Sequence, residues 1–107
     1  MFLDVGERLQ LLQILNAQRE DIAGLKSILR TTEVLSFSPD EVAGLKFQQD
    51  GAQLKWDLSS EFNMPKEIPI DQWLTDKIRD ILQNLNIQHQ LTQGLASLYE
   101  KFITDYQ

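Results

Sequence analysis

The chain has 107 residues, a formal net charge of −6 and no cysteine. This length predicts a single domain, residues 1–107, with one hydrophobic core, and the absence of thiols excludes disulfides and cysteine-ligated zinc. The acidic balance, with its scattered basic residues, disfavours nucleic acid and anionic membranes as partners. The N-terminal residues lack the pattern of a signal peptide, and no apolar run is long enough to span a bilayer, so we expect a cytoplasmic protein without membrane contact.

Two amphipathic helices are predicted at the start of the chain. Asp4 and Glu7 fit a D-x-x-E helix start, and apolar residues recur at helical spacing from there to Asn16. After a polar break, a second periodic segment runs from Ile22 to Leu29. We expect the two helices to form an αα-hairpin.

A short helix is predicted in the middle of the chain. The segment before it, 31–37 (TTEVLSF), is β-branched and apolar, which favours a short strand or an extended connection. The run 38–41, Ser-Pro-Asp-Glu, then combines an N-cap, a proline at the first helical position and the glutamate of a capping box. We expect this helix to run to Ala43 and to end at Gly44.

Residues 45–57, LKFQQDGAQLKWD, predict a β-hairpin on which the helices pack. Asp50-Gly51 is interpreted as a two-residue turn. This register pairs four large apolar side chains on one face: Phe47 with Leu54, and Leu45 with Trp56. The sequence AGLK also occurs in the second helix, so Leu45-Lys46 can instead continue the preceding helix and shorten the first strand.

The segment that follows the hairpin is predicted to be a loop and a strand. Residues 58–66 contain Ser, Asn and Pro and form the longest candidate loop. Residues 67–70, Glu-Ile-Pro-Ile, fit a third short strand. Pro69 places that strand at an edge, because proline cannot donate a hydrogen bond to a neighbouring strand.

Two further helices are predicted at the end of the chain. Asp71 caps the strongest helical pattern, whose apolar residues extend from Leu74 to Leu85. Thr92 can cap a last helix whose apolar residues continue to Tyr106. The predicted fold class is therefore α+β, with a helical pair, a small antiparallel β-hairpin or three-stranded sheet, and a C-terminal helical pair.

Residues that commonly carry catalysis or metal binding are not arranged for it here. No P-loop, Rossmann fingerprint or G-x-S-x-G motif occurs. His89 is the only histidine and falls in a polar connection, where we expect it to be exposed. Asp76 and Asp80 lie one helical turn apart with Lys77 and Arg79 interleaved, which is typical of a solvated face. We expect no catalytic residue, no metal and no cofactor.

Two small sets of residues are candidates for binding. Phe62, Met64 and Trp73 form a candidate interaction patch, because aromatic residues and methionine are enriched in interfaces. The alternative is that Trp73 anchors the preceding loop. For an anionic ligand the candidate contacts are Lys46, Lys55 and Arg79.

Several segments together give the chain a resemblance. ERLQLLQIL, LSFSPDE, LKFQQDGAQLKWD, KEIPI and LTQGLASLYEKF follow in an order that resembles a group of short hypothetical proteins of bacteriophages and prophages. The resemblance covers most of the chain and includes no catalytic motif. It implies a phage genome as the setting.

We expect a non-enzymatic phage-type protein that acts by protein–protein interaction, as an assembly component or as a modulator of a host protein. Its partner would be a host or virion protein, or a second copy of itself, since the last helix carries more apolar residues than one short helix needs. The alternative is a small-ligand protein that sequesters a nucleotide in a pocket between subunits of an oligomer.

Overall fold

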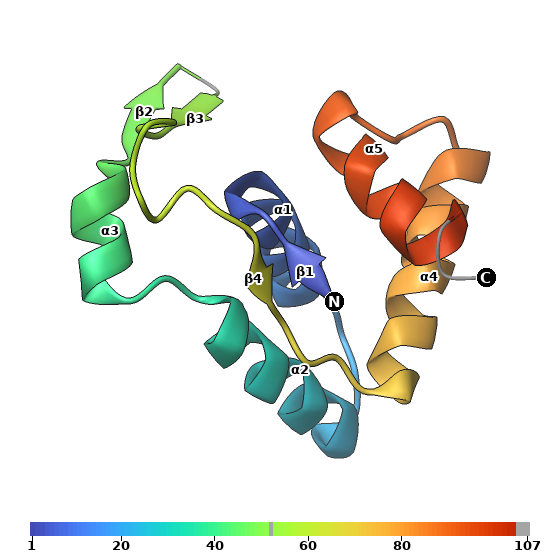
Figure 1. Cartoon of the computed structure of the whole chain (residues 1–107). Helices are drawn as coiled ribbons and strands as arrows, with labels where there is room; N and C mark the ends of the chain where they lie inside the picture. The colour runs from blue at the N-terminus through green and yellow to red at the C-terminus, as the bar shows by residue number, and fades with distance from the viewer. Residues whose placement is uncertain (52, 105–107) are drawn as a thin grey trace.

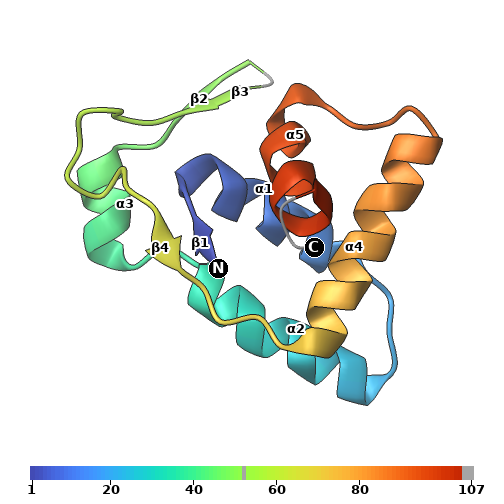
Figure 2. The same cartoon turned by 45° about the vertical axis from the view of Figure 1, so that its right-hand side comes forward.

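The computed structural model describes residues 1–51 and 53–104, which form five α-helices and two small antiparallel sheets. The α+β fold class is therefore confirmed. Helix α1 lies in the middle of the molecule, with α2 and α5 against it, while α3 and the hairpin lie at the end opposite α4 (Figures 1 and 2). In chain order the elements are β1 (Phe2–Leu3), α1 (Val5–Asn16), α2 (Ile22–Leu35), α3 (Pro39–Leu45), β2 (Gln48–Asp50), β3 (Gln53–Lys55), β4 (Lys66–Glu67), α4 (Gln72–Ile87), α5 (Gln93–Tyr99) and a π-helical turn (Glu100–Thr104).

The predicted αα-hairpin is present, and α1 begins where its capping box indicated. The Asp4 side chain accepts a hydrogen bond from the Glu7 N–H at 2.8 Å, and the Glu7 carboxylate accepts one from the Asp4 N–H at 3.0 Å. These reciprocal bonds satisfy two backbone donors at the helix start. They also fix the direction in which α1 leaves β1.

Helix α2 is longer than predicted, and the strand or extended connection proposed for 31–37 is wrong over most of its length. Thr31 and Thr32 lie inside the helix with their side chains buried, and the Thr32 hydroxyl donates to the Leu29 carbonyl at 2.9 Å. Leu35, the last helical residue, is wholly buried. Packing against the core therefore outweighs the β preference of these residues.

Helix α3 has the predicted capping box at Ser38 and Glu41 but extends two residues past Ala43. Gly44 does not end it. Lys46 caps the helix in the left-handed conformation, with φ 52°. Gly44 instead gives space to Phe62, because a Cβ atom at residue 44 would overlap the Phe62 ring.

The hairpin forms with a register different from the predicted one. Its strands pair Gln48 with Lys55, Gln49 with Leu54 and Asp50 with Gln53, so Asp50 is a strand residue and the connection comes one residue later. Leu45 belongs to α3 and cannot pair with Trp56. The first strand is therefore short, in agreement with the alternative in which the preceding helix continues into Leu45.

The second sheet pairs β1 with β4, two short strands that lie far apart in the sequence. The expected strand at 67–70 is found at Lys66–Glu67, and it pairs with β1 in antiparallel register rather than with the hairpin. A three-stranded sheet is therefore wrong. The Ile68 N–H donates to the Met1 carbonyl at 2.8 Å and extends this pairing by one bond.

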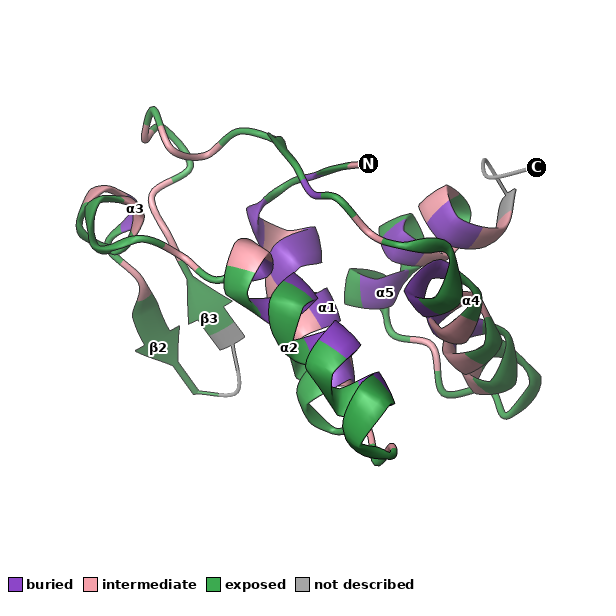
Figure 3. Cartoon of the chain, turned by 90° about the horizontal axis from the view of Figure 1, so that it is seen from below, coloured by how far each residue is buried: buried purple, intermediate pink, exposed green. Residues whose placement is uncertain are grey.

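The core lies between the facing sides of α1, α2, α4 and α5, where the buried residues gather (Figure 3). Asp71 caps α4 as predicted, and the helix runs to Ile87, two residues past the end of the apolar pattern at Leu85. Leu95, Leu98 and Phe102 are buried in the core, so the apolar residues that suggested an oligomer are used inside the chain. Tyr106 lies outside the described residues. Among the described helices, none combines the length and hydrophobicity required to cross a bilayer.

Candidate functional site

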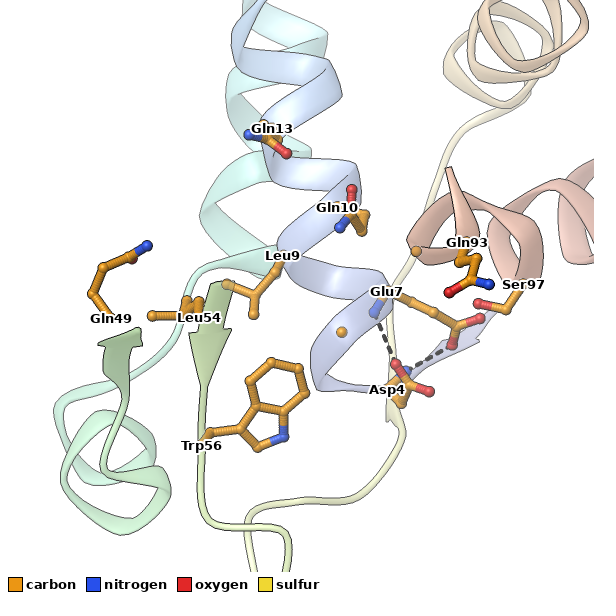
Figure 4. A pocket seen from close by; sticks show the side chains of 12 residues that line it. Asp4, Glu7, Leu9, Gln10, Gln13, Gln49, Leu54, Trp56, Gln93 and Ser97 are labelled. Carbon is orange, nitrogen blue, oxygen red and sulfur yellow. Dashed lines mark hydrogen bonds between the residues drawn. The ribbon is translucent and has the colours of Figure 1, made fainter. Parts of the chain in front are cut away.

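A groove of about 790 Å³ lies between the first turns of α1, the hairpin and the start of α5 (Figure 4). Strand β3 provides one wall and α5 the other, while α1 forms the floor. The lining residues are Asp4, Gly6, Glu7, Leu9, Gln10, Gln13, Gln49, Leu54, Trp56, Gln93, Gly94 and Ser97.

The hairpin wall of the groove has two apolar side chains beside Gln49. Leu54 and Trp56 lie there beside Leu9 of α1 (Figure 4). The Trp56 indole N–H donates to the Asn63 side chain at 3.0 Å, which fixes the ring. Trp56 also makes an edge-to-face contact with the ring of Phe47. Trp56, which the sequence placed on the apolar face of the hairpin, is half-buried and presents part of its ring to the groove.

The floor and the far wall include three glutamine amides. Gly6, Gln10 and Gln13 follow one another at helical spacing on α1, and Gln93 faces them from α5. The Gln10 amide lies so close to Gly94 that a Cβ at residue 94 would come within 2.8 Å of its Nε2. Amide side chains both donate and accept hydrogen bonds, so this surface can pair with a polypeptide backbone.

Two carboxylates lie at one end of the groove. Asp4 is exposed, whereas Glu7 is only 3% exposed. Glu7 Oε1 accepts a hydrogen bond from Lys101 Nζ at 2.7 Å, and the Glu7 carboxylate faces the Ser97 hydroxyl of α5. Burial raises the pKa of Glu7, but the Asp4 backbone N–H, Lys101 and the facing Ser97 hydroxyl outweigh it and hold that pKa below its usual value.

The charged residues that line the groove are all acidic. Asp4 and Glu7 line it, and none of the described lining residues is Lys, Arg or His. Lys101 compensates Glu7 from outside the lining set. The site therefore suits a neutral or cationic group better than an anion. Elsewhere in the described residues, no three His, Asp or Glu side chains converge to hold a metal ion.

The three residues of the predicted interaction patch are not brought together. Phe62 packs on Gly44 of α3, and Met64 in the same loop is 59% exposed. Trp73 is 45% exposed and lies against Gly24 of α2. It belongs to the first turn of α4, and α4 lies at the end of the molecule away from α3 (Figure 1). Trp73 therefore packs on α2, and its predicted role as an anchor of the preceding loop stays a prediction.

Two of the three predicted anion contacts are neighbours. Lys46 and Lys55 line a small pocket of about 230 Å³ beside Trp56, and Lys55 makes an ion pair with Asp50 at 2.8 Å. Arg79 lies on α4 and is not among the residues of that pocket. Sequence reasoning thus identified neighbours on the hairpin, but not one convergent cationic site.

The groove itself was not predicted. Its glutamines are four of the twelve in the chain, which sequence alone cannot distinguish from a general compositional habit. The one usable signal is the polar stripe Gly6-Gln10-Gln13, which indicates a helix face turned away from the core. No protein-family model, curated protein or solved structure matches the chain.

Proposed function

We propose that this chain is a non-enzymatic protein that acts by binding another protein, and that the groove between the hairpin and α5 is its binding site. One observation carries the proposal: the apolar side chains of Leu54 and Trp56 on one wall face the glutamine amides of Gln10, Gln13 and Gln93 across the groove. These are the two kinds of surface that an extended polypeptide needs.

The proposal follows from the chemistry of a peptide. Each residue of an extended segment offers one N–H donor and one C=O acceptor, and glutamine amides can pair with both. Alternate side chains of the segment would point to the hairpin wall, where Leu54 and Trp56 provide apolar contact. Aromatic residues in such positions often dominate binding energy.

The phage-type resemblance suggests the setting in which this binding takes place. We propose that the partner is a host or virion protein met in the cytoplasm of the host cell. The protein would act on that partner as an assembly component or as a modulator. Both roles require the same groove to be occupied, so one experiment addresses them together.

The alternative of an oligomer that sequesters a nucleotide has less support. A nucleotide phosphate requires convergent cations, whereas the described groove residues include two carboxylates and no Lys or Arg. The pocket beside Lys46 and Lys55 is small, and one of its two lysines is already paired with Asp50.

Site-specific photo-crosslinking tests the proposal. A photoreactive phenylalanine analogue replaces Leu54, which is 38% exposed at the groove, and in a control variant it replaces Ile87, which is 73% exposed at the end of α4. We expect a light-dependent adduct with one segment of a host or virion protein from position 54 only. Equal adducts from both positions, or no adduct together with turnover of a metabolite by the protein, would contradict the proposal.

A further inference from the structure

We infer that the outer face of α2 joins two copies of the chain in a symmetric, antiparallel dimer. Ile22, Leu25 and Leu29 form an apolar row along this face, and Lys26 and Glu33 lie beside the row. None of the described residues of α2 lines the groove, and α2 lies on the side of α1 away from the hairpin (Figures 1 and 2). Dimerisation through this face is therefore independent of the groove and leaves it open to its partner.

Helix α2 buries small and polar residues while large aliphatic side chains stay outside. Four of its six buried residues are glycine, serine or threonine. Ile22 is 68% exposed, Leu25 41% and Leu29 57%, and their spacing of three and four residues places them in one row. Figure 3, which views the molecule from below, shows the exposed side of α2 running along the helix. A surface helix normally turns such a row towards the core, so the row indicates a partner outside the chain.

The charges beside the row identify that partner as a second copy. The side chains of Lys26 and Glu33 are exposed and make no ion pair or hydrogen bond within the described part of the chain. Their positions are equally far from a point beside Leu29, so a two-fold axis through that point sets each Lys26 opposite the Glu33 of the other copy. The two Leu29 side chains then meet at the axis, between two ion pairs. Antiparallel helices also bring opposite dipole ends together.

The net charge of the chain does not oppose this contact. Although the chain carries −6, the charged residues of α2 are Lys26, Arg30 and Glu33, two cations and one anion. The surplus carboxylates therefore lie on other faces. An acidic partner protein would pair with Lys26 and Arg30 but would be repelled by Glu33, whereas a second copy supplies both signs in the positions required.

The area of contact sets the strength of the dimer. A single pair of helices buries less than about 1,200 Å² in total, which is the size of weak and transient interfaces. We expect a Kd of roughly 10–100 μM, so dimers form where copies of the chain accumulate. The dimer carries two grooves, and a partner that repeats its bound segment would be held by both at once.

Sedimentation velocity of the full chain, from about 1 μM to 1 mM, tests the inference. We expect the mass to rise from that of one chain to that of two. Leu29→Ser should raise the Kd by about tenfold or more, whereas Ile87→Ser, at a position 73% exposed at the end of α4, is the control and should not change it. Circular dichroism below the Kd checks that both variants remain folded. A chain that stays monomeric, or a dimer that Leu29→Ser leaves intact, overturns the inference.

Charge exchange tests the antiparallel register separately. Lys26→Glu sets like charges opposite each other, as does Glu33→Lys, so each variant alone should dimerise about tenfold more weakly than the parent. In an equal mixture the two variants should form a heterodimer with a Kd close to that of the parent, because every cation of one then faces an anion of the other. A mixture that associates no more strongly than the separate variants overturns the antiparallel pairing. A dimer as strong as the parent in either variant alone also overturns it.

Discussion

The guanidinium of Arg8 and the carboxylate of Glu41 lie 2.7 Å apart, although 33 residues separate them in the sequence. Arg8 is almost completely buried and also donates to the carbonyls of Leu35 and Ser36, at 3.1 and 2.9 Å. The Phe37 ring covers the guanidinium at 4.0 Å. A single side chain of α1 therefore holds the end of α2 and the start of α3 in place.

This ion pair predicts an acid-sensitive fold. The hydrogen bond from Arg8 lowers the pKa of Glu41 to about 2 from 4.5. A carboxyl whose pKa is lower in the folded chain stabilises the fold above pH 4.5, and that stabilisation is lost as the pH falls towards 2. We expect Glu41→Gln to lower the free energy of unfolding by about 2 kcal/mol at pH 7 and to flatten its pH dependence in this range.

Urea unfolding at several pH values between 2 and 7 measures both effects. Glutamine retains the capping box, so the loss reports on the ion pair. Glu33→Gln, at an exposed position of α2, is the control and should leave the stability within about 0.5 kcal/mol. A Glu41→Gln protein with the stability and acid dependence of the parent would contradict the prediction.

Two helical glycines should respond to alanine in opposite directions. Alanine favours a helix over glycine by about 1 kcal/mol. At Gly6 a Cβ would meet its nearest neighbours at 3.6 Å, so Gly6→Ala should raise the free energy of unfolding by part of that amount. At Gly44 a Cβ would overlap the Phe62 ring, so Gly44→Ala should lower it by about 1–3 kcal/mol. Thermal unfolding of both variants decides this, and changes of equal sign would be inconsistent with the packing.

The Glu7–Lys101 pair predicts non-additive effects on stability. Lys101→Met removes the partner of a buried carboxylate and should lower the free energy of unfolding by about 1–3 kcal/mol at pH 7. The double variant with Glu7→Gln should recover part of this loss, because the uncompensated charge is then absent. Denaturant unfolding of the two single variants and the double variant gives the coupling. Strictly additive losses would show that the pair makes no contribution of its own.

The hairpin register can be tested with engineered cysteines, because the chain has none. Gln49 and Leu54 are opposite each other, whereas the register expected from the sequence pairs Leu54 with Phe47. We expect Gln49→Cys with Leu54→Cys to form an intramolecular disulfide on mild oxidation, faster than Phe47→Cys with Leu54→Cys. Thiol titration over time measures the rate of disulfide formation. Faster oxidation of the Phe47→Cys, Leu54→Cys variant would favour the register expected from the sequence.

The features that sequence predicts correctly are local ones. Asp4, Ser38 and Asp71 were each identified as an N-cap, because each side chain meets a backbone N–H only three residues further on. The amphipathic pattern of α4 likewise reflects contacts along a single helix. These elements need no knowledge of what lies across the molecule.

The features that escape prediction depend on distant partners. Helix α3 runs through Leu45, past a glycine that Phe62 covers, and this moves the hairpin register. Strand β1 has only two residues, and they form a strand because they pair with β4, far along the chain. The groove combines three separate segments, 4–13, 49–56 and 93–97, and only the stripe on α1 is visible in the sequence, because the fold alone brings the three segments together.

Two contacts join the start of the chain to much later residues: β1 pairs with β4, and Glu7 pairs with Lys101 across 94 residues. During synthesis on the ribosome they can form only after those later residues have been added. Helices α1 and α2 can pair soon after they emerge, since they are neighbours in the sequence and pack on each other. The groove cannot form so early, because one wall is anchored by residues synthesised after position 90. The groove therefore has both of its walls only after residues 93–97 have been synthesised and have packed against α1.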